Sequence, residues 1–177
     1  MSKIAMIYST TDGHTKVIVE FLCRAIDASN LVQISSVSSA TNMRLDYFDK
    51  VVIGASIRYG NYKSELFKYI ESQRDILETK DTYFFSVNVV ARKHDKSTPA
   101  TNPYMIKFLE KTTWKPNYTA VFAGKVNYPS YNIFNKSVIR LIMYATGGPT
   151  DTSRSFEFTD WTHVKHFGKK ISENESR

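Results

Sequence analysis

Ser9-Thr10-Thr11-Asp12-Gly13-His14-Thr15 is the stretch around which the chain is organised. It lies between an apolar run at residues 4–8 and an amphipathic helix pattern that begins near residue 15. An extended segment that ends in hydroxyls and a glycine, and then opens a helix, directs backbone N–H groups and the positive end of the helix dipole at one point. The stretch therefore predicts a phosphate-binding loop. The alternative is an ordinary polar turn with a helix cap.

The loop differs from two common nucleotide-binding motifs. Gly13 is not followed by Lys-Ser or Lys-Thr, and the chain has no G-x-G-x-x-G sequence. A nucleotide-hydrolysing P-loop and a dinucleotide fingerprint are therefore excluded. A carboxylate pointing into a phosphate site would repel the anion, so we expect Asp12 to face outward and cap the helix. The cofactor-binding candidates in this loop are Thr10, Thr11, Asp12, Gly13, His14 and Thr15.

The composition is that of one globular domain with an excess of positive charge. The 177 residues carry a net charge of +7 and one cysteine, Cys23. An internal disulfide is excluded, and because the N-terminus has no secretory leader we expect a cytoplasmic protein. No apolar run approaches the ~20 residues of a membrane-spanning helix. The charge favours an anionic partner, although no nucleic-acid motif is present. We expect one domain at 1–172 and a tail at 173–177.

Apolar runs alternate with amphipathic patterns along the chain. Helices are predicted near residues 15–26, 66–77 and 104–111 and from residue 160 onward, whereas the serine-rich residues 35–41 and the basic residues 91–103 are predicted loops. The alternation implies a doubly wound, five-stranded parallel sheet in a three-layer α/β/α arrangement. The strands are predicted at residues 4–8, 31–34, 51–55, 82–90 and 120–124.

Two further loops follow strands that end at the same edge as the first loop. Ligands of open α/β sheets bind at the carboxyl ends of the strands, so the loops at residues 56–60 and 86–92 are expected to bracket a planar ring. Tyr59 is a candidate for stacking on that ring, and a half-buried loop aromatic is the alternative. The binding candidates in these loops are Ser56, Ile57, Arg58, Tyr59, Gly60, Ser86, Val87, Asn88, Val89, Ala91 and Arg92.

These motifs together resemble a known family. The first loop is similar to the flavodoxin phosphate loop, which holds the monophosphate of FMN without a cationic side chain. The further segments at 54–60, 86–93, 150–152 and 159–161 resemble the flavodoxin-like, quinone-dependent protoporphyrinogen IX oxidases of bacteria, and the likeness runs nearly end to end. The resemblance implies FMN as the cofactor and a role for Gly60, whose peptide can flip next to flavin N5.

The same resemblance implies a function in haem biosynthesis. The expected reaction is the FMN-dependent oxidation of protoporphyrinogen IX to protoporphyrin IX, with menaquinone or ubiquinone as acceptor. The chemistry takes place at flavin N5, and no side-chain base is assigned. The expected location is the cytoplasmic face of the inner membrane, to which the protein would bind peripherally. The oligomeric state stays open.

An insertion at about residues 125–154 interrupts the simple pattern, and long-chain flavodoxins have an insertion that splits the fifth strand. Its helix, predicted at residues 133–145, has an apolar face made by residues 134, 138, 141, 142 and 145. This apolar face lies next to the cations Lys136 and Arg140, as in a helix that lies on an anionic bilayer. The alternative is that the apolar face packs on the domain. A substrate with two propionates needs cations and aromatic walls, for which Arg58 and Arg92 are also available. The other candidates for substrate or membrane contact are Lys93, Lys125, Tyr128, Tyr131, Phe134, Lys136 and Arg140.

Two other functions fit the same fold. A flavodoxin-type electron carrier is disfavoured by the charge of +7, because such carriers are typically acidic. An NAD(P)H:quinone reductase would be distinguished by rapid reduction of its flavin by NAD(P)H. His163 and His166 lie three residues apart in the last helix, but no third ligand is evident, so no metal site is predicted.

Overall fold

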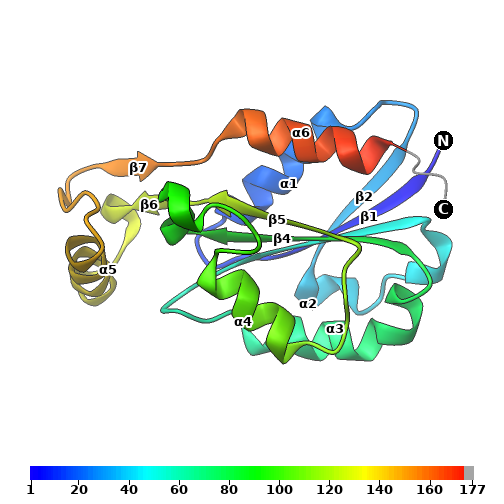
Figure 1. The fold of residues 1–177 in the computed structure, drawn as a ribbon, viewed down its shortest axis with the longest axis horizontal. Helices are drawn as coiled ribbons and strands as arrows, with labels where there is room; N and C mark the ends of the chain where they lie inside the picture. Colours follow the sequence, from blue (N-terminus) through cyan, green and yellow to red (C-terminus); the bar gives the residue numbers. More distant parts are fainter. Residues whose placement is uncertain (174–177) are drawn as a thin grey trace.

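A five-stranded parallel sheet forms the centre of the computed structural model, which describes residues 1–173 (Figure 1). The strand order is β2-β1-β3-β4-β5, which is that of flavodoxin-like doubly wound sheets. This order confirms the predicted fold class. The strands are β1 (Lys3–Ser9), β2 (Leu31–Ser36), β3 (Lys50–Ser56), β4 (Asp81–Asn88) and β5 (Tyr118–Ala123).

The helices cover both faces of the sheet, which is why the central strands are apolar throughout rather than alternating. On one face, α1 (His14–Ala25) and α6 (Trp161–Ser172) bury their apolar sides against the strands. On the other face lie α2 (Val37–Ala40), α3 (Ser64–Leu77) and α4 (Pro103–Lys111). Figure 1 shows the two layers of helices on opposite sides of the strands. The predicted three-layer arrangement is thus observed.

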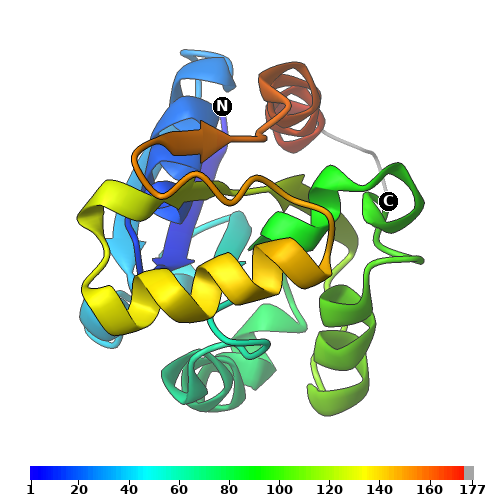
Figure 2. The same ribbon diagram turned by 90° about the vertical axis from the view of Figure 1, so that its left-hand side faces the viewer.

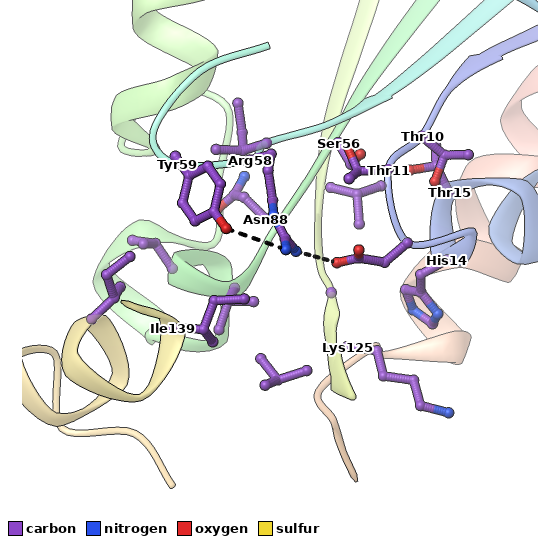
Figure 3. Close-up of a pocket in the computed structure, with 18 of the residues that line it drawn as sticks. Thr10, Thr11, His14, Thr15, Ser56, Arg58, Tyr59, Asn88, Lys125 and Ile139 are labelled. Carbon is purple, nitrogen blue, oxygen red and sulfur yellow. Dashed lines mark hydrogen bonds and ion pairs between the residues drawn. The ribbon is translucent and has the colours of Figure 1, made fainter. Parts of the chain in front are cut away.

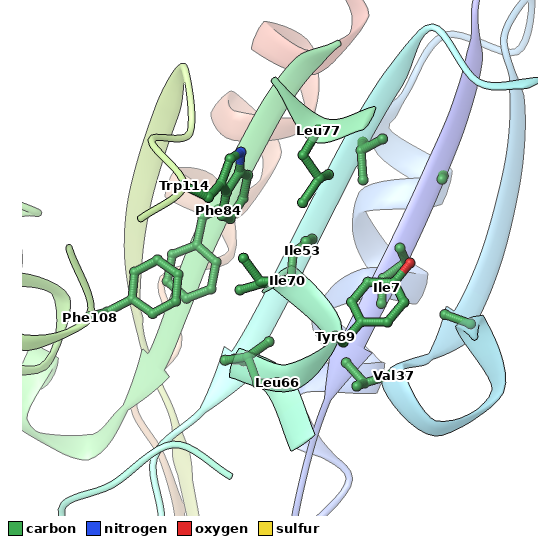
Figure 4. Packing of buried hydrophobic residues seen from close by; sticks show 14 of the residues in the cluster. Ile7, Val37, Ile53, Leu66, Tyr69, Ile70, Leu77, Phe84, Phe108 and Trp114 are labelled. Atoms are coloured by element: carbon green, nitrogen blue, oxygen red, sulfur yellow. The ribbon is translucent and has the colours of Figure 1, made fainter. Parts of the chain in front are cut away.

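Aromatic side chains fill the core beneath α3 and α4 (Figure 4). The rings of Phe84 and Phe108 stack with their centroids 3.8 Å apart, and Trp114 meets Phe84 edge-on. All three side chains are fully buried. This packing fixes α4 against β4 and therefore fixes the loop that leaves the carboxyl end of β4.

Two predicted loops contain regular structure. The serine-rich segment was predicted wrongly, because β2 continues to Ser36 and α2 follows directly. The Ser36 hydroxyl accepts a hydrogen bond from the Ser39 amide and so caps this short helix. The basic segment after β4 contains two short 3₁₀ helices, η2 (Val89–Arg92) and η3 (His94–Lys96). Two others, η1 (Leu45–Tyr47) and η4 (Tyr128–Ser130), connect elements elsewhere.

The insertion forms a small separate unit at one end of the sheet. It contains β6 (Lys125–Asn127), α5 (Ile133–Ala145) and β7 (Ser155–Glu157), and the bounds of α5 are those predicted. β6 and β7 pair antiparallel in a sheet of their own, whereas β5 runs unbroken in the main sheet. The predicted splitting of the fifth strand is therefore not confirmed. Figure 2 shows α5 lying across the end of the main sheet.

Two predictions concern the ends and the membrane. The predicted tail begins at Glu173, and its residues 174–177 lie outside the described part of the chain. No helix within residues 1–173 combines the length and the apolar character needed to cross a membrane.

Candidate active site

A cleft opens at the carboxyl ends of the strands, where the three predicted ligand loops meet the insertion (Figure 3). It encloses about 830 Å³, part of which is open to solvent. The loops follow β1, β3 and β4, and the first two lie on either side of the point where the strand order reverses. The predicted residues that line the cleft are Thr10, Thr11, Asp12, His14, Thr15, Ser56, Ile57, Arg58, Tyr59, Gly60, Val87, Asn88, Val89, Lys125 and Tyr131.

Other predicted residues are placed elsewhere. Gly13 is the N-cap of α1, and Tyr128 is buried in the insertion, where its hydroxyl donates to the Pro149 carbonyl. The predicted apolar face of α5 mostly points away from the cleft, since Phe134 is 72% exposed and Leu141 is 68% exposed. The predicted residues outside the cleft lining are Gly13, Ser86, Ala91, Arg92, Lys93, Tyr128, Phe134, Lys136 and Arg140.

The phosphate loop has the features of an anion site. Gly13 has φ +84°, and among the described residues no side chain caps α1, so the first amides of the helix face the cleft without a local acceptor. The hydroxyls of Ser9 and Thr15 are buried, with no hydrogen-bond partner in the described part of the chain. A buried hydroxyl without a partner is destabilising, so the loop fits a ligand that supplies acceptor oxygens, as a phosphate does.

Asp12 does not cap the helix, which corrects the prediction. Its Oδ2 accepts hydrogen bonds from Arg58 Nη1 at 2.7 Å and from the Tyr131 hydroxyl at 3.1 Å. Burial lowers the pKa of Arg58, but Asp12 and Tyr59 outweigh this effect and hold that pKa above its usual value. The arginine thus supplies the counter-charge that lets a carboxylate stand beside a phosphate site.

His14 is fixed as a neutral group beside the same loop. Its Nε2 lies 2.7 Å from the Thr159 hydroxyl, which in turn donates to the Ala123 carbonyl. Because the hydroxyl has one proton to donate, His14 Nε2 is the donor to Thr159. Burial is the main cause that lowers the pKa of His14. The loop is also supported from outside the cleft by Lys63, whose Nζ donates a hydrogen bond to the Thr10 carbonyl at 2.7 Å.

The loop after β3 forms a tight turn at the mouth of the cleft. Tyr59 and Gly60 both have positive φ, at 49° and 77°, and the backbones of Arg58 and Asn61 bond to each other across the turn. A positive φ is unusual for a tyrosine, and such conformations concentrate at ligand sites. The turn therefore presents the Tyr59 ring and the Gly60 peptide to the cleft, as expected for a ring-binding loop.

The loop after β4 is held by a buried network of polar side chains. Asn88 and Asn102 form reciprocal amide hydrogen bonds of 3.1 and 3.3 Å. Asn88 Oδ1 accepts from the Ala91 amide, and its Nδ2 donates to the Ser86 hydroxyl, which also accepts from Tyr62. Ser86 and Ala91 thus act beneath the cleft rather than in its lining. Burial raises the pKa of Tyr62, so its hydroxyl keeps the proton that it donates.

Helix α5 contributes an apolar wall that the sequence did not predict. Ile139, Ile142 and Met143 face the cleft, and of these only Ile142 belongs to the predicted apolar face of the helix. The helix is anchored at its C-terminal end by Arg92, whose Nη2 donates to the Thr146 carbonyl at 2.8 Å and whose Nη1 donates to the Val89 carbonyl. Arg92 is therefore a structural cation between two loops, and of the six candidate cations for substrate or membrane contact only Arg58 and Lys125 line the cleft.

Asn102 is another residue that the sequence analysis did not identify. It caps α4 by accepting from the amides of Tyr104 and Met105, and Pro103 follows it as the first helical residue. Asn followed by Pro before an apolar helix pattern is a recognisable start signal, so this cap could have been found. Its pairing with Asn88 could not, because that contact depends on the tertiary fold.

Comparisons with known proteins agree with this geometry. The family model described as a flavodoxin domain matches residues 5–153. The protoporphyrinogen IX dehydrogenase (quinone) of Leishmania major is 40% identical over 172 residues, which are 96% of this chain and 74% of that protein. The protein of the same name in Escherichia coli strain K12 is 37% identical over 171 residues, which cover 96% of this chain and 94% of the relative.

Solved structures give the same fold at much lower identity. Oxidised flavodoxin 1 from Bacillus cereus superposes with a TM-score of 0.56 at 14% identity, covering 99% of this chain and all of the flavodoxin. A flavodoxin from the domain Archaea gives a TM-score of 0.51 at 17% identity, with 96% of each chain covered. At these identities the likeness shows the fold alone.

Proposed function

The chain belongs to the flavodoxin-domain family, within which its relatives are quinone-dependent protoporphyrinogen IX dehydrogenases, and we propose that it oxidises protoporphyrinogen IX and passes the electrons to a quinone. The observation that carries the proposal is one cleft in which an anion loop, two ring-binding loops and the apolar wall of α5 come together. A phosphate-bearing flavin and an apolar, flat substrate need these two kinds of surface side by side.

We infer that the flavin is FMN. The two buried hydroxyls without partners, Ser9 and Thr15, fit a terminal phosphate, and the left-handed conformation of Gly13 brings the backbone of the loop close to such a group. When bound, the flavin supplies the two-electron acceptor for each step and then gives the electrons to the quinone. The protein residues position both partners and tune that exchange.

The side chains of the cleft divide the remaining work. Tyr59 and the wall formed by Ile139, Ile142 and Met143 bound the space for a flat apolar ring system and exclude water from it. Arg58 and Lys125 supply the positive charge for the substrate carboxylates, and each is already near an acidic side chain, at 2.7 Å from Asp12 and 3.7 Å from Glu157. No side-chain base is assigned, so the chemistry rests on positioning.

The test of this function is anaerobic addition of protoporphyrinogen IX to the oxidised, FMN-loaded protein. We expect the flavin absorbance to bleach, and porphyrin fluorescence to appear only after a quinone is added, because complete oxidation removes six electrons and each FMN accepts two. A flavin that stays oxidised with protoporphyrinogen would overturn the proposal. Rapid bleaching by NAD(P)H instead would identify a quinone reductase, and both outcomes are recorded in the same absorbance experiment.

We propose further that the outer face of α5 binds the cytoplasmic side of an anionic membrane, where menaquinone or ubiquinone is available. Ile133, Phe134, Leu141 and Tyr144 are exposed large apolar side chains on this one helix. Lys136 and Arg140 lie on the same helix. Exposed apolar groups flanked by cations are the features of a helix that lies in the membrane interface.

Reversing these two charges should weaken membrane binding. For Lys136→Glu with Arg140→Glu we expect the binding free energy to fall by about 1 kcal/mol for each charge removed, and by more on reversal. Co-sedimentation with vesicles that contain anionic lipid measures the change, and FMN content should not alter. The matched control is Lys165→Glu with Lys169→Glu, which changes the net charge equally on the exposed side of α6. Equal loss of binding in both double variants would mean that net charge, rather than α5, governs the association.

A further inference from the structure

A cluster of polar and aromatic side chains joins the insertion to two ligand loops. Asp12 from the phosphate loop, Arg58 from the loop after β3 and Tyr131 from the insertion meet at the carboxylate of Asp12. The Arg58 guanidinium also lies over the Tyr131 ring, 5.0 Å from its centroid, and over the Tyr59 ring at 4.8 Å. Figure 3 shows the line of contacts that runs from Tyr59 through Arg58. We call Asp12, Arg58 and Tyr131 the clasp.

The clasp stabilises one end of the insertion, while a different contact anchors the other end. At the N-terminal end of α5, Asn135 accepts a hydrogen bond from the Tyr59 hydroxyl next to the clasp. At the C-terminal end, Arg92 is bonded to backbone carbonyls and to the Thr146 hydroxyl. Between these two attachments, Ile139 and Met143 form the wall of the cleft. The position of the wall therefore depends on both attachments.

We propose that Asp12, Arg58 and Tyr131 are positioning residues, which hold α5 closed over the flavin site and thereby set the binding of the porphyrinogen. The substrate part of this inference rests on the proposed function. The contacts support it because Asp12 and Arg58 form a charged pair at 2.7 Å and the other members shield it, with 16% of the Arg58 side chain, 35% of the Asp12 side chain and 9% of Tyr131 accessible. Hydrogen bonds to charged groups of this kind are stronger than neutral ones.

The clasp also couples closure of the insertion to the cofactor. Asp12 is a member of the phosphate loop, so any movement of that loop on FMN binding changes the contact with Tyr131. By thermodynamic reciprocity, a clasp that strengthens FMN binding at equilibrium must in turn be stabilised by FMN. If Asp12 acted only as a negative charge that repels the phosphate, removing its carboxylate would strengthen FMN binding instead of weakening it.

The experiment compares Asp12→Ala, Tyr131→Phe and the double variant in the FMN-loaded protein. FMN release is followed by fluorescence after dilution, and opening of the insertion is followed by trypsin cleavage at Arg140 in α5. We expect release to be about tenfold faster in Asp12→Ala and several-fold faster in Tyr131→Phe, with faster cleavage in both. Tyr131→Phe removes the hydrogen bond to Asp12 but leaves every charge in place. Its effect therefore reports on the clasp contact and not on repulsion between Asp12 and the phosphate. In the double variant, the two effects should not multiply.

The control is Asp46→Ala, which breaks an exposed ion pair with Arg44 and alters the net charge equally. Slower release in Asp12→Ala, unchanged release in Tyr131→Phe, or effects equal to those of the control would each overturn the clasp. Neither readout uses the porphyrinogen, so they are independent of the proposed reaction. In steady-state assays with protoporphyrinogen, the KM of Asp12→Ala and of Tyr131→Phe should rise about fivefold, whereas their kcat should change less than about twofold. An unchanged KM in a variant whose insertion opens would overturn the substrate-positioning role.

Discussion

Replacing Thr15 by Val should weaken FMN binding by about 10- to 100-fold, because a hydrogen bond to a charged group contributes roughly 1.5–3 kcal/mol. The Thr15 hydroxyl is fully buried at the start of α1, with no partner among the described residues. This hydroxyl proton lies in the phosphate loop, so we expect a phosphate oxygen of FMN to accept its hydrogen bond. Val has nearly the same shape, and the loop should keep its conformation.

The sign of the stability change makes this prediction specific. In the FMN-free protein, the substitution removes an unpaired buried hydroxyl, so the free energy of unfolding should stay equal or rise. Fluorescence titration with FMN and urea unfolding of the apoprotein measure the two quantities separately. Thr82→Val is the matched control, because its hydroxyl is buried but bonded to Asn117. That variant should be less stable and bind FMN normally. A Thr15→Val protein with unchanged FMN affinity would show that the phosphate does not occupy this loop.

Local sequence patterns predicted the main sheet well, for a physical reason. The strands β1, β3 and β4 are buried on both faces and so have no polar alternation. A helix pattern with an apolar stripe follows each of them along the chain, so these signals depended on neighbouring residues. The same holds for α5, whose bounds were correct because Asn132 caps its start and Gly147 follows its end with a positive φ. The short helix α2 was missed because its cap is one serine within a run of serines.

The site was predicted less completely, because its remaining parts are tertiary contacts. Arg92 lies in the predicted loop but bonds to the carbonyl of Thr146, 54 residues away. Asp12 has its partners at positions 58 and 131. The local sequence does not indicate which distant residue a charged side chain will contact. Ile139 and Met143, on the inner face of α5, were missed for a related reason. The helix is apolar on most sides, and periodicity alone could not identify the buried side.

Replacing Asn102 by Ala should lower the free energy of unfolding by about 3 kcal/mol, the sum of a lost helix cap of about 1 kcal/mol and of buried partners left unpaired. The Asn102 side chain is fully buried, accepts from two amides of α4, and donates to Asn88 and to the Lys96 carbonyl. Removing it leaves the Asn88 amide incompletely bonded beneath the ring-binding loop. FMN affinity should therefore fall as well, because the loop after β4 loses its support.

The matched control for this substitution is Asn132→Ala, which removes a cap of the same residue type from α5. Asn132 is exposed, and its side chain accepts from the Asn135 amide, so this variant should lose only about 1 kcal/mol. Chemical denaturation of both apoproteins gives the difference, which is the part that the buried pairing with Asn88 and Lys96 contributes. If the two variants were equally stable, the reciprocal amide pair would add nothing beyond a helix cap. In that case the rigidity of the ring-binding loop would have to come from the stacked core of Phe84 and Phe108 below it.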